Sequence, residues 1–338
     1  MSTKSKATTE DLKLVSSVSA MDMSKTLGGV GALHGEKQYT IQELETMGAD
    51  GQLAGMNLSG VEIVGRKAGD LAGINLSGDC LTGTNFDGDN LSDANLSGAN
   101  LTAAFASGAH LENANLVGIS AMDFNLNGAD LLGANISHAD LQDAQLKGIN
   151  FTDLNTNSEI YQSGHMLDVD FQGAQMQGSN LSHLNLAADG VDLVYAALQG
   201  AKLSGANMEG MNLEGIILNK SDLMGADLAG ADIVGGNISN SNFNGADMEG
   251  ITIKGGVVMG SSFEGANMIF ADMSGLDRGN NGPSDNNFEG ADLSHANLSN
   301  SNMTDSNFDF CNLTDTNWSG AATEGSTFYG AKGNIPRG

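Results

Sequence analysis

The stretch Asn85–Leu146 reads NFDGD NLSDA NLSGA NLTAA FASGA HLENA NLVGI SAMDF NLNGA DLLGA NISHA DLQDA QL. Most groups of five contain a large apolar residue, usually Leu, that directly follows Asp or Asn. A small residue, usually Ala, stands two positions before the Leu. A period of five matches neither the 3.6-residue period of an amphipathic helix nor the two-residue period of a half-buried strand. The stretch is therefore an internal repeat, and its period decides the fold.

The repeat extends over most of the 338-residue chain. Its large apolar residues, which we call centres, start irregularly at Leu53 and then recur in steps of five from Leu71 to Leu186 and from Leu193 to Phe328. In extended backbone, residues two apart share a face, so the small residue and the centre point inward and the Asp or Asn points outward. Glycine, which is abundant, suits a tight turn at the end of each unit. The pattern predicts a solenoid with a thin apolar core.

Several phenylalanines recur at intervals of twenty residues, which is four units. They are Phe151 with Phe171, Phe243 with Phe263, and Phe288 with Phe308 and Phe328. Because like aromatic residues stack on successive coils of a solenoid, this interval predicts a coil with four sides. At about 4.8 Å per coil, about 14 coils form a rod about 65 Å long.

The repeated phrase A-(D/N)-L-x-G is the signature of the pentapeptide-repeat family, which this chain resembles over about residues 51–333. The resemblance implies an all-β fold, a right-handed quadrilateral parallel β-helix whose Ala and Leu positions fill the core. Members of this family have diverse functions, and a fold does not by itself identify a function.

The chain divides into three expected parts: an N-terminal arm with a helical cap at 1–50, the β-helix at 51–333, and a tail at 334–338. Thr40 and Glu43 have the spacing of a capping box, and Tyr39 and Leu44 that of a hydrophobic staple. We therefore expect a short helix over residues 41–47 that covers the first coil, since a solenoid needs a capped end. The part before residue 36 is either a disordered arm or one that becomes ordered on a partner.

Three places interrupt the repeat. Three extra residues precede Leu71 and two precede Leu193, and both additions are expected to bulge from corners of the coil. The segment Leu276–Asn287 keeps the five-residue phase but would place Arg278 in a core position. Because a buried unpaired charge is too costly, we expect this segment to leave the wall as a loop.

The chain is strongly acidic, with a net charge of −27. After residue 50 it has 34 acidic and 9 basic residues, so the solenoid carries nearly all of this charge. Counting in twenties places one set of aspartates on one side of the coil, with neutral residues interleaved. This candidate acidic face consists of Asp70, Asp130, Asp170, Asp192, Asp232, Asp272 and Asp292. These aspartates either favour the turns and keep the protein soluble, or they form a face that binds a basic partner.

The sequence contains no phosphate-binding loop, dinucleotide fingerprint or zinc-protease motif. Cys80 precedes a centre and should face outward, whereas Cys311 occupies a small-residue position and should be buried. The six histidines are scattered without a second ligand close in sequence. We therefore expect no catalytic residue, no metal site and no cofactor, and we predict that the protein is not an enzyme.

Two functional hypotheses remain. The first is a non-catalytic structural scaffold, such as an assembly or virion component or an effector, that binds a protein with a basic surface. The second is a mimic of DNA that inhibits or protects a DNA-binding enzyme such as DNA gyrase. Some pentapeptide-repeat proteins resemble B-DNA in width and charge and act on gyrase in this way. This chain is similar to them in repeat and acidity, but it is longer and lacks their C-terminal helical segment.

The remaining expectations follow from charge and composition. A rod this acidic should not bind nucleic acid directly. No secretory signal or membrane-spanning run of apolar residues is visible, which favours a cytoplasmic or virion-associated protein without membrane contact. The open rod ends and the N-terminal arm are the surfaces through which we expect any homo-oligomer to form.

Overall fold

The computed structural model describes residues 39–40, 63–64, 71–154, 166, 168–276 and 284–336. Regular strands are very short. Strand β1 (Tyr39–Thr40) pairs in parallel with β2 (Ile63–Val64), and β3 (Asn312–Leu313) pairs in parallel with β4 (Lys332–Gly333). One 3-10 turn, η1, covers Phe151–Leu154. Most other pairing consists of isolated parallel bridges, because each side of the coil has room for only one unit.

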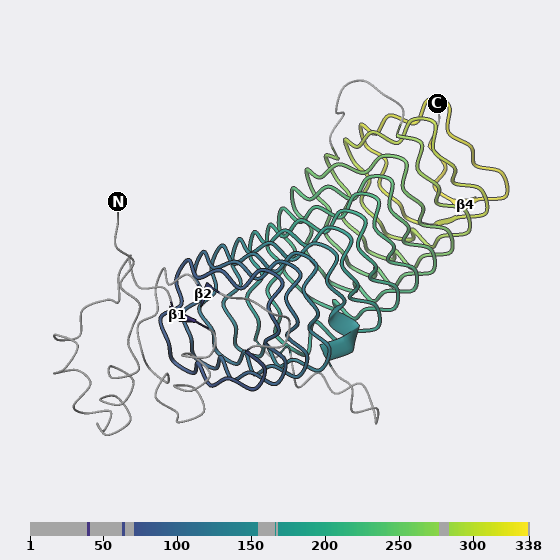
Figure 1. The fold of residues 1–338 in the computed structure, drawn as a ribbon. Coiled ribbons are helices and arrows are strands. Elements are labelled where there is room, and N and C mark those ends of the chain that lie inside the picture. The colour runs from purple at the N-terminus through teal and green to yellow at the C-terminus, as the bar shows by residue number, and fades with distance from the viewer. Residues whose placement is uncertain are drawn as a thin grey trace, which may run out of the picture.

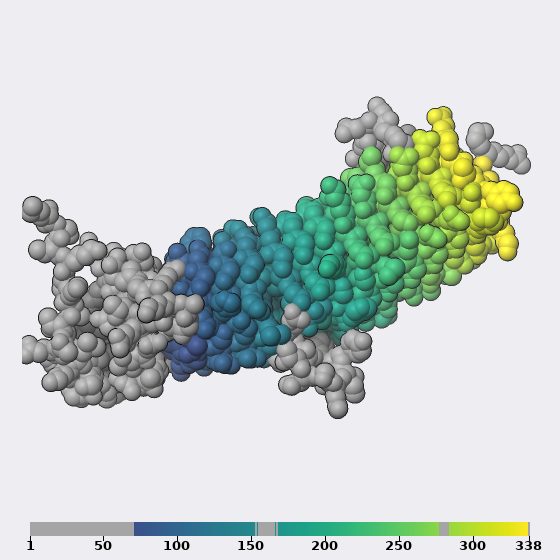
Figure 2. All heavy atoms as spheres, turned by 45° about the vertical axis from the view of Figure 1, so that its right-hand side comes forward, coloured from purple at the N-terminus to yellow at the C-terminus, as the bar shows by residue number. Residues whose placement is uncertain are grey.

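The chain winds into a stack of four-sided coils that forms an elongated rod (Figures 1 and 2). Asn75 bridges Asn95, and Asn95 bridges Asn115, so one coil contains twenty residues, or four units. The Leu76 N–H donates to the Asn95 carbonyl at 2.7 Å, and the Asn95 N–H donates to the Ile74 carbonyl at 2.8 Å. This arrangement recurs along the rod and confirms the predicted fold, a right-handed quadrilateral parallel β-helix.

We number the four sides in chain order from their first described outward residues: Asn75 (side 1), Cys80 (side 2), Asn85 (side 3) and Asn90 (side 4). Each coil contributes to every side one outward residue that directly precedes a centre and pairs with the next coil. On side 2 these are Cys80, Asn100, Ser120, Asp140, Asp170, Asp192, Asn212, Asp232, Thr252, Asp272, Asn297 and Asn317. The described rod therefore has twelve coils on this side. The predicted total of about 14 included residues 51–70, most of which lie outside the described part.

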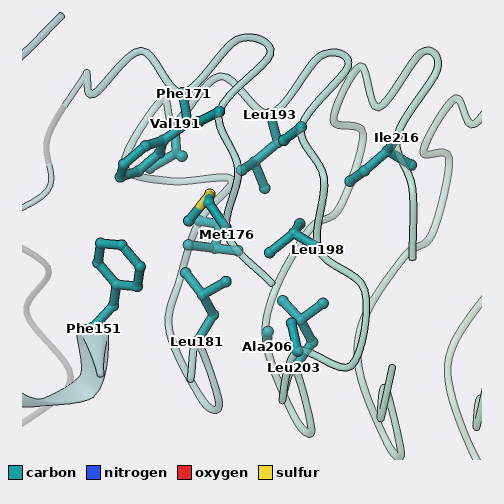
Figure 3. Close-up of a cluster of buried hydrophobic side chains, with 14 of the residues drawn as sticks. Phe151, Phe171, Met176, Leu181, Val191, Leu193, Leu198, Leu203, Ala206 and Ile216 are labelled. Atoms are coloured by element: carbon teal, nitrogen blue, oxygen red, sulfur yellow. The ribbon is translucent and has the colours of Figure 1, made fainter. Parts of the chain in front are cut away.

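The centres and the small residues fill the interior, as predicted (Figure 3). On side 4 five phenylalanines, Phe243, Phe263, Phe288, Phe308 and Phe328, stack with centroid distances of 5.2, 4.9, 4.8 and 5.2 Å and nearly parallel rings. The interval of twenty residues predicted the stacking of Phe243 on Phe263 and of Phe288 on Phe308 and Phe328. It did not predict that Phe263 stacks on Phe288, which is 25 residues later. The interval between these two residues is therefore five residues longer than one coil.

Two intervals between paired residues are longer than one coil by whole units. Asp140 bridges Asp170, 30 residues later, and Ser262 bridges Asn287, 25 residues later. Against a coil of twenty residues, ten residues are therefore extra in the first interval and five in the second. The five-residue phase from Leu71 to Leu186 therefore does not mean that every unit adds one side to the coil. Residues 277–283, in the segment predicted to leave the wall, lie outside the described residues.

The first insertion also corrects one predicted stack. The Phe151 N–H donates to the Asn180 carbonyl, so Phe151 lies one coil from Leu181 and not in the column of Phe171. The two rings still meet inside the rod, edge to face, with centroids 5.5 Å apart (Figure 3). The shorter addition before Leu193 is a turn closed by the Asp189 N–H and the Asn185 carbonyl at 3.2 Å, as expected for a bulge.

The structure describes only residues 39–40 and 63–64 at the N-terminal end of the rod, whereas it describes the C-terminal end up to residue 336. Tyr39 and Thr40, predicted to begin the cap, lie in β1 and pair with β2, so parallel pairing starts before residue 51. Glu43, Leu44 and the helix predicted over 41–47 lie outside the described residues. At the other end the Trp318 and Phe328 rings pack edge to face, with centroids 6.0 Å apart, over the last coils.

Most described corners of the coil are tight turns in which one residue has a positive φ. Gly215 and Gly225 occupy two such corners, with φ of +66° and +64°. Tyr195 occupies the corner one coil before Gly215, and its ring lies over this glycine: a Cβ added at Gly215 would stand 2.2 Å from Tyr195 Cδ1. Nothing lies within 4 Å of a Cβ added at Gly225. Glycine at 215 therefore avoids both the strain of a positive φ and a clash with the ring above it.

We expect Gly225→Ala to lower the free energy of unfolding by about 1–2 kcal/mol, the cost of a left-handed conformation for a residue with a Cβ. Gly215→Ala should cost more, because the new methyl group also displaces the Tyr195 ring and its hydrogen bond to Glu214. Urea denaturation followed by circular dichroism measures both values. Adding Tyr195→Ala should remove the excess, and equal destabilisation by the two single substitutions would contradict the contact.

The two cysteines should differ in reactivity. Cys311 is buried, its Sγ donates to the Phe288 carbonyl at 2.8 Å, and burial raises the pKa of the thiol to about 12. Cys80 is an outward residue of side 2 and is only partly buried. An aromatic disulfide reagent at pH 8 should therefore label one thiol rapidly in the folded protein and both in denaturant. Rapid labelling of both thiols in the folded protein would contradict the burial of Cys311.

Candidate interaction surface

The aspartates predicted to form one face lie on three different sides. Asp170, Asp192, Asp232 and Asp272 are on side 2, Asp130 is on side 4 and Asp292 is on side 1, while Asp70 lies outside the described residues. The single predicted column was therefore wrong.

The insertions explain this error. Ten extra residues are two units, and five extra residues are one unit, so each insertion moves later residues to another side without changing the five-residue phase. Asp170 consequently follows Asp140 and not Asn150, and Asp292 follows Asn267 and not Asp272. Only the pairing between coils reveals the shift.

The corrected register brings three carboxylates together on side 2. Asp140 bridges Asp170, and Asp170 bridges Asp192, so these three aspartates occupy consecutive coils with no amide between them. The predicted interleaving of acidic and neutral residues is absent here. Each Oδ1 accepts a hydrogen bond from the N–H two residues later, at 3.2, 2.9 and 2.9 Å, which holds the carboxylates in similar orientations.

Glutamines on the same side link two of these carboxylates to the preceding coil. Gln142 Nε2 donates to Asp170 Oδ2 at 2.8 Å, and Gln172 Nε2 donates to Asp192 Oδ2 at 2.9 Å. The glutamines satisfy oxygen lone pairs but supply no positive charge. The carboxylates therefore repel one another across coils, since like charges on neighbouring strands are unfavourable.

Further along side 2 the negative charge is balanced. Lys254 Nζ lies 2.7 Å from Asp272 Oδ2. Partial burial alone raises the pKa of Asp272, but hydrogen bonds from Lys254 and Ser274 outweigh it and hold the pKa below its usual value. From Asp123 to Asp232, by contrast, side 2 has no Lys or Arg among its outward residues. The acidic residues in that span are Asp123, Asp140, Asp143, Asp170, Asp192, Glu214 and Asp232.

Side 1 has a different organisation. Its first part is an amide ladder, in which Asn95 Nδ2 donates to Asn75 Oδ1 and Asn115 Nδ2 donates to Asn95 Oδ1, both at 3.2 Å. Farther along, Asp292 receives two hydrogen bonds from Asn312 Nδ2, at 3.0 and 3.1 Å. Burial raises the pKa of Asp292, but hydrogen bonds from Ser294 and Asn312 outweigh it and leave the pKa below its usual value. From Asn267 to Asn312 amides and acids alternate on this side, whereas Asp227 and Asp247 are direct neighbours on consecutive coils.

Side 3 is the least acidic part of the rod. From Phe105 to Gly260, a span of eight coils, its outward residues include no Asp or Glu, and they include Lys147 and Lys220. Amides dominate this span: Asn125, Asn127, Gln145, Gln175, Gln177, Gln199, Asn219, Asn237 and Asn240. Two neighbouring sides of one rod therefore differ completely in charge over the same coils.

Side 4 brings together three residues that the sequence analysis treated separately. His110 and Asp130 are neighbours on consecutive coils, and Glu112 lies two residues after His110, with His110 Nδ1 3.1 Å from Glu112 Oε1. Burial raises the pKa of Glu112, but hydrogen bonds involving its own backbone, Ser92 and His110 outweigh it and lower the pKa. A search of the sequence for potential ligands that are two and twenty residues apart would have found this cluster.

Two other histidines meet carboxylates at corners of side 1. His138 Nδ1 lies 3.4 Å from Asp168 Oδ2, and His295 Nδ1 lies 3.7 Å from Asp315 Oδ2. The His295 ring also stacks on Phe270, with centroids 4.9 Å apart. Each of these pairs has one carboxylate, so neither resembles the cluster on side 4. In the described part of the chain, no helix has the length and apolar character needed to cross a membrane.

Comparison with known structures finds other β-solenoids. HetL, a pentapeptide repeat protein involved in heterocyst differentiation regulation in the cyanobacterium Nostoc, is 19% identical over 87% of this chain and 96% of its own, with a TM-score of 0.32. Full-length QnrB1, a plasmid-mediated fluoroquinolone resistance protein, is 14% identical over 86% of this chain and 93% of its own, with a TM-score of 0.19. No curated protein sequence matches the chain.

The family model for pentapeptide repeats matches the chain in eight copies. They cover residues 70–105, 80–118, 123–153, 170–210, 188–219, 211–245, 221–255 and 287–320. Together these copies span more than half of the sequence, and none of them includes residues 155–165 or 277–283. With twenty-residue coils built from Ala and Leu positions, this protein belongs to the pentapeptide repeat family.

Proposed function

We propose that this protein is a non-catalytic scaffold that binds a basic protein surface through side 2. The observation that carries the proposal is the run of Asp140, Asp170 and Asp192 on consecutive coils. Their mutual repulsion is unfavourable in the isolated protein, and a cationic partner would relieve it. An acidic surface that served only solubility would not require three unseparated carboxylates, because Asn makes the same local hydrogen bonds at equivalent positions such as Asn95.

The difference in charge between side 2 and side 3 determines which face of the rod a basic partner would contact. A basic partner is attracted by the acidic span between Asp123 and Asp232 and finds no acidic residue on side 3 over the corresponding coils. Charge complementarity of this kind contributes more to specificity and association rate than to affinity. The stiff ladder of backbone hydrogen bonds keeps the carboxylates at fixed intervals, so a partner with matching spacing loses little conformational entropy on binding.

The proposal is tested with the triple variant Asp140→Asn, Asp170→Asn and Asp192→Asn. A matched control is Asp227→Asn, Asp247→Asn and Asp292→Asn, which removes the same charge from side 1. Binding of a fluorescent decalysine peptide is measured by anisotropy across a salt series. We expect the side 2 variant to weaken binding about tenfold and the control much less, with the difference fading as salt screens the charges.

Equal weakening by the two triple variants would show that only the total charge matters, and it would reject a specific role for side 2. Both variants should melt no lower than the wild type, because Asn already occupies other positions in both columns and the side 2 variant also removes the repulsion between carboxylates.

The second candidate function is imitation of DNA toward a DNA-binding enzyme such as DNA gyrase. Acidic residues on sides 1, 2 and 4 favour this function. So does the regular spacing of Asp140, Asp170 and Asp192, which lie on consecutive coils about 4.8 Å apart. Duplex DNA carries one charge per about 1.7 Å, so the rod is a less dense polyanion of similar character. The enzyme's DNA-binding groove would then be the basic surface that side 2 meets.

A gyrase supercoiling assay in a salt series distinguishes this function from the general scaffold. Wild-type protein should inhibit or protect the enzyme at low salt, lose the effect as salt rises, and compete with duplex DNA. The side 2 triple variant should be inactive and the side 1 variant active. Absence of any effect at micromolar protein would reject the imitation of DNA and leave the scaffold with another partner.

A further inference from the structure

We propose that His110, Glu112 and Asp130 bind a divalent transition-metal ion on side 4, with Zn²⁺ as the ion that fits them best. This site is separate from the acidic run of side 2 and does not depend on the proposed function. One imidazole nitrogen and two carboxylate oxygens, one from each residue, lie within 4.8 Å of one another. Among the described residues no other group of His, Cys, Asp and Glu converges in this way.

The coil itself brings these residues together. His110 and Glu112 stand on either side of the buried centre Leu111, so both side chains point outward from the same short segment. Asp130 occupies the position of His110 one coil later, and the two are paired in the bridge that joins the coils. The three groups therefore lie on rigid backbone, and binding an ion requires only side-chain adjustments.

The distances suit a metal ion after a small movement. Zinc holds nitrogen and oxygen ligands at about 2.0–2.2 Å, which places neighbouring ligand atoms roughly 3–3.6 Å apart. His110 Nδ1 and Glu112 Oε1 are already 3.1 Å apart. Asp130 is exposed, so a small side-chain adjustment that keeps the hydrogen bond to its Oδ1 can bring its Oδ2 closer to the other two ligand atoms. Water would complete the coordination, because the cluster lies at the surface.

Hydrogen bonds hold two of the three ligands in place. Ser92 Oγ, one coil earlier, donates to Glu112 Oε2 at 2.8 Å and leaves Oε1 directed toward His110. The Leu132 N–H donates to Asp130 Oδ1 at 3.0 Å. Partners of this kind orient metal ligands, and their removal typically lowers metal affinity 10- to 100-fold.

The donor set selects the class of ion. Calcium prefers six to eight oxygen ligands and magnesium retains most of its water, so neither gains much from an imidazole. One imidazole with two carboxylates suits zinc and similar transition metals. The side 1 pairs, His138 with Asp168 and His295 with Asp315, each offer a single carboxylate and serve as natural comparisons.

Isothermal titration calorimetry with zinc chloride, in a buffer that does not coordinate metals, tests the proposal on the full chain. The informative variants are His110→Asn and Asp130→Asn, because the same column carries Asn at positions 90, 150 and 180 and the coil accepts it. We expect one zinc ion per chain for the wild type and at least a tenfold loss of affinity in each variant. Ser92→Ala should weaken binding by about tenfold.

His138→Asn is the matched control and should leave zinc affinity unchanged. A millimolar excess of magnesium should not displace the zinc. Unchanged affinity in His110→Asn or Asp130→Asn would overturn the proposal. So would several weak, equivalent sites that persist in every variant, since these would reflect only the acidic surface. Melting temperatures equal to the wild type establish that the variants are folded.

Discussion

The hydrogen bonds between successive coils determine the rest of this structure. The N–H of each centre donates to the carbonyl of the outward residue one coil later, as Leu81 does to Asn100 and Leu203 does to Asp222, both at 2.7 Å. These bonds can be repeated only if the chain returns to the same position after every coil. Four units with equal corners meet this requirement. Each side chain consequently lies directly beside its counterpart in the next coil.

This stacking explains the interior and the amide surface together. Flat rings in the column of Phe288 and Phe308 pack face to face because their backbones are in register. Serines occupy small-residue positions of the same core: the Oγ atoms of Ser221, Ser241 and Ser261 each donate to a carbonyl of the preceding coil at 2.7 Å. These three buried hydroxyl groups are tolerated because each one is hydrogen-bonded.

On the outer surface the same register produces both attraction and repulsion. Asparagines in one column donate to each other, as in the ladder of side 1, whereas aspartates in one column repel. Asp140, Asp170 and Asp192 are therefore an unfavourable arrangement of like charges, whereas His110 and Asp130 place an imidazole beside an acid. Both features arise from residues one coil apart, which is why a repetitive surface still has distinct sites.

The sequence by itself determined the repeat, the inward positions, the four-sided coil and the burial of Cys311, because each depends on a local period of five or twenty residues. It also located an interruption of the coil after Leu276, since Arg278 does not fit the core, and the interval from Ser262 to Asn287 is five residues longer than a coil. Only the tertiary structure decided which residues share a side. An insertion of whole units leaves the local pattern intact but turns the following chain by one or two sides. The pairing of Asp140 with Asp170 and of Phe263 with Phe288 is set by contacts between coils, which no local pattern encodes.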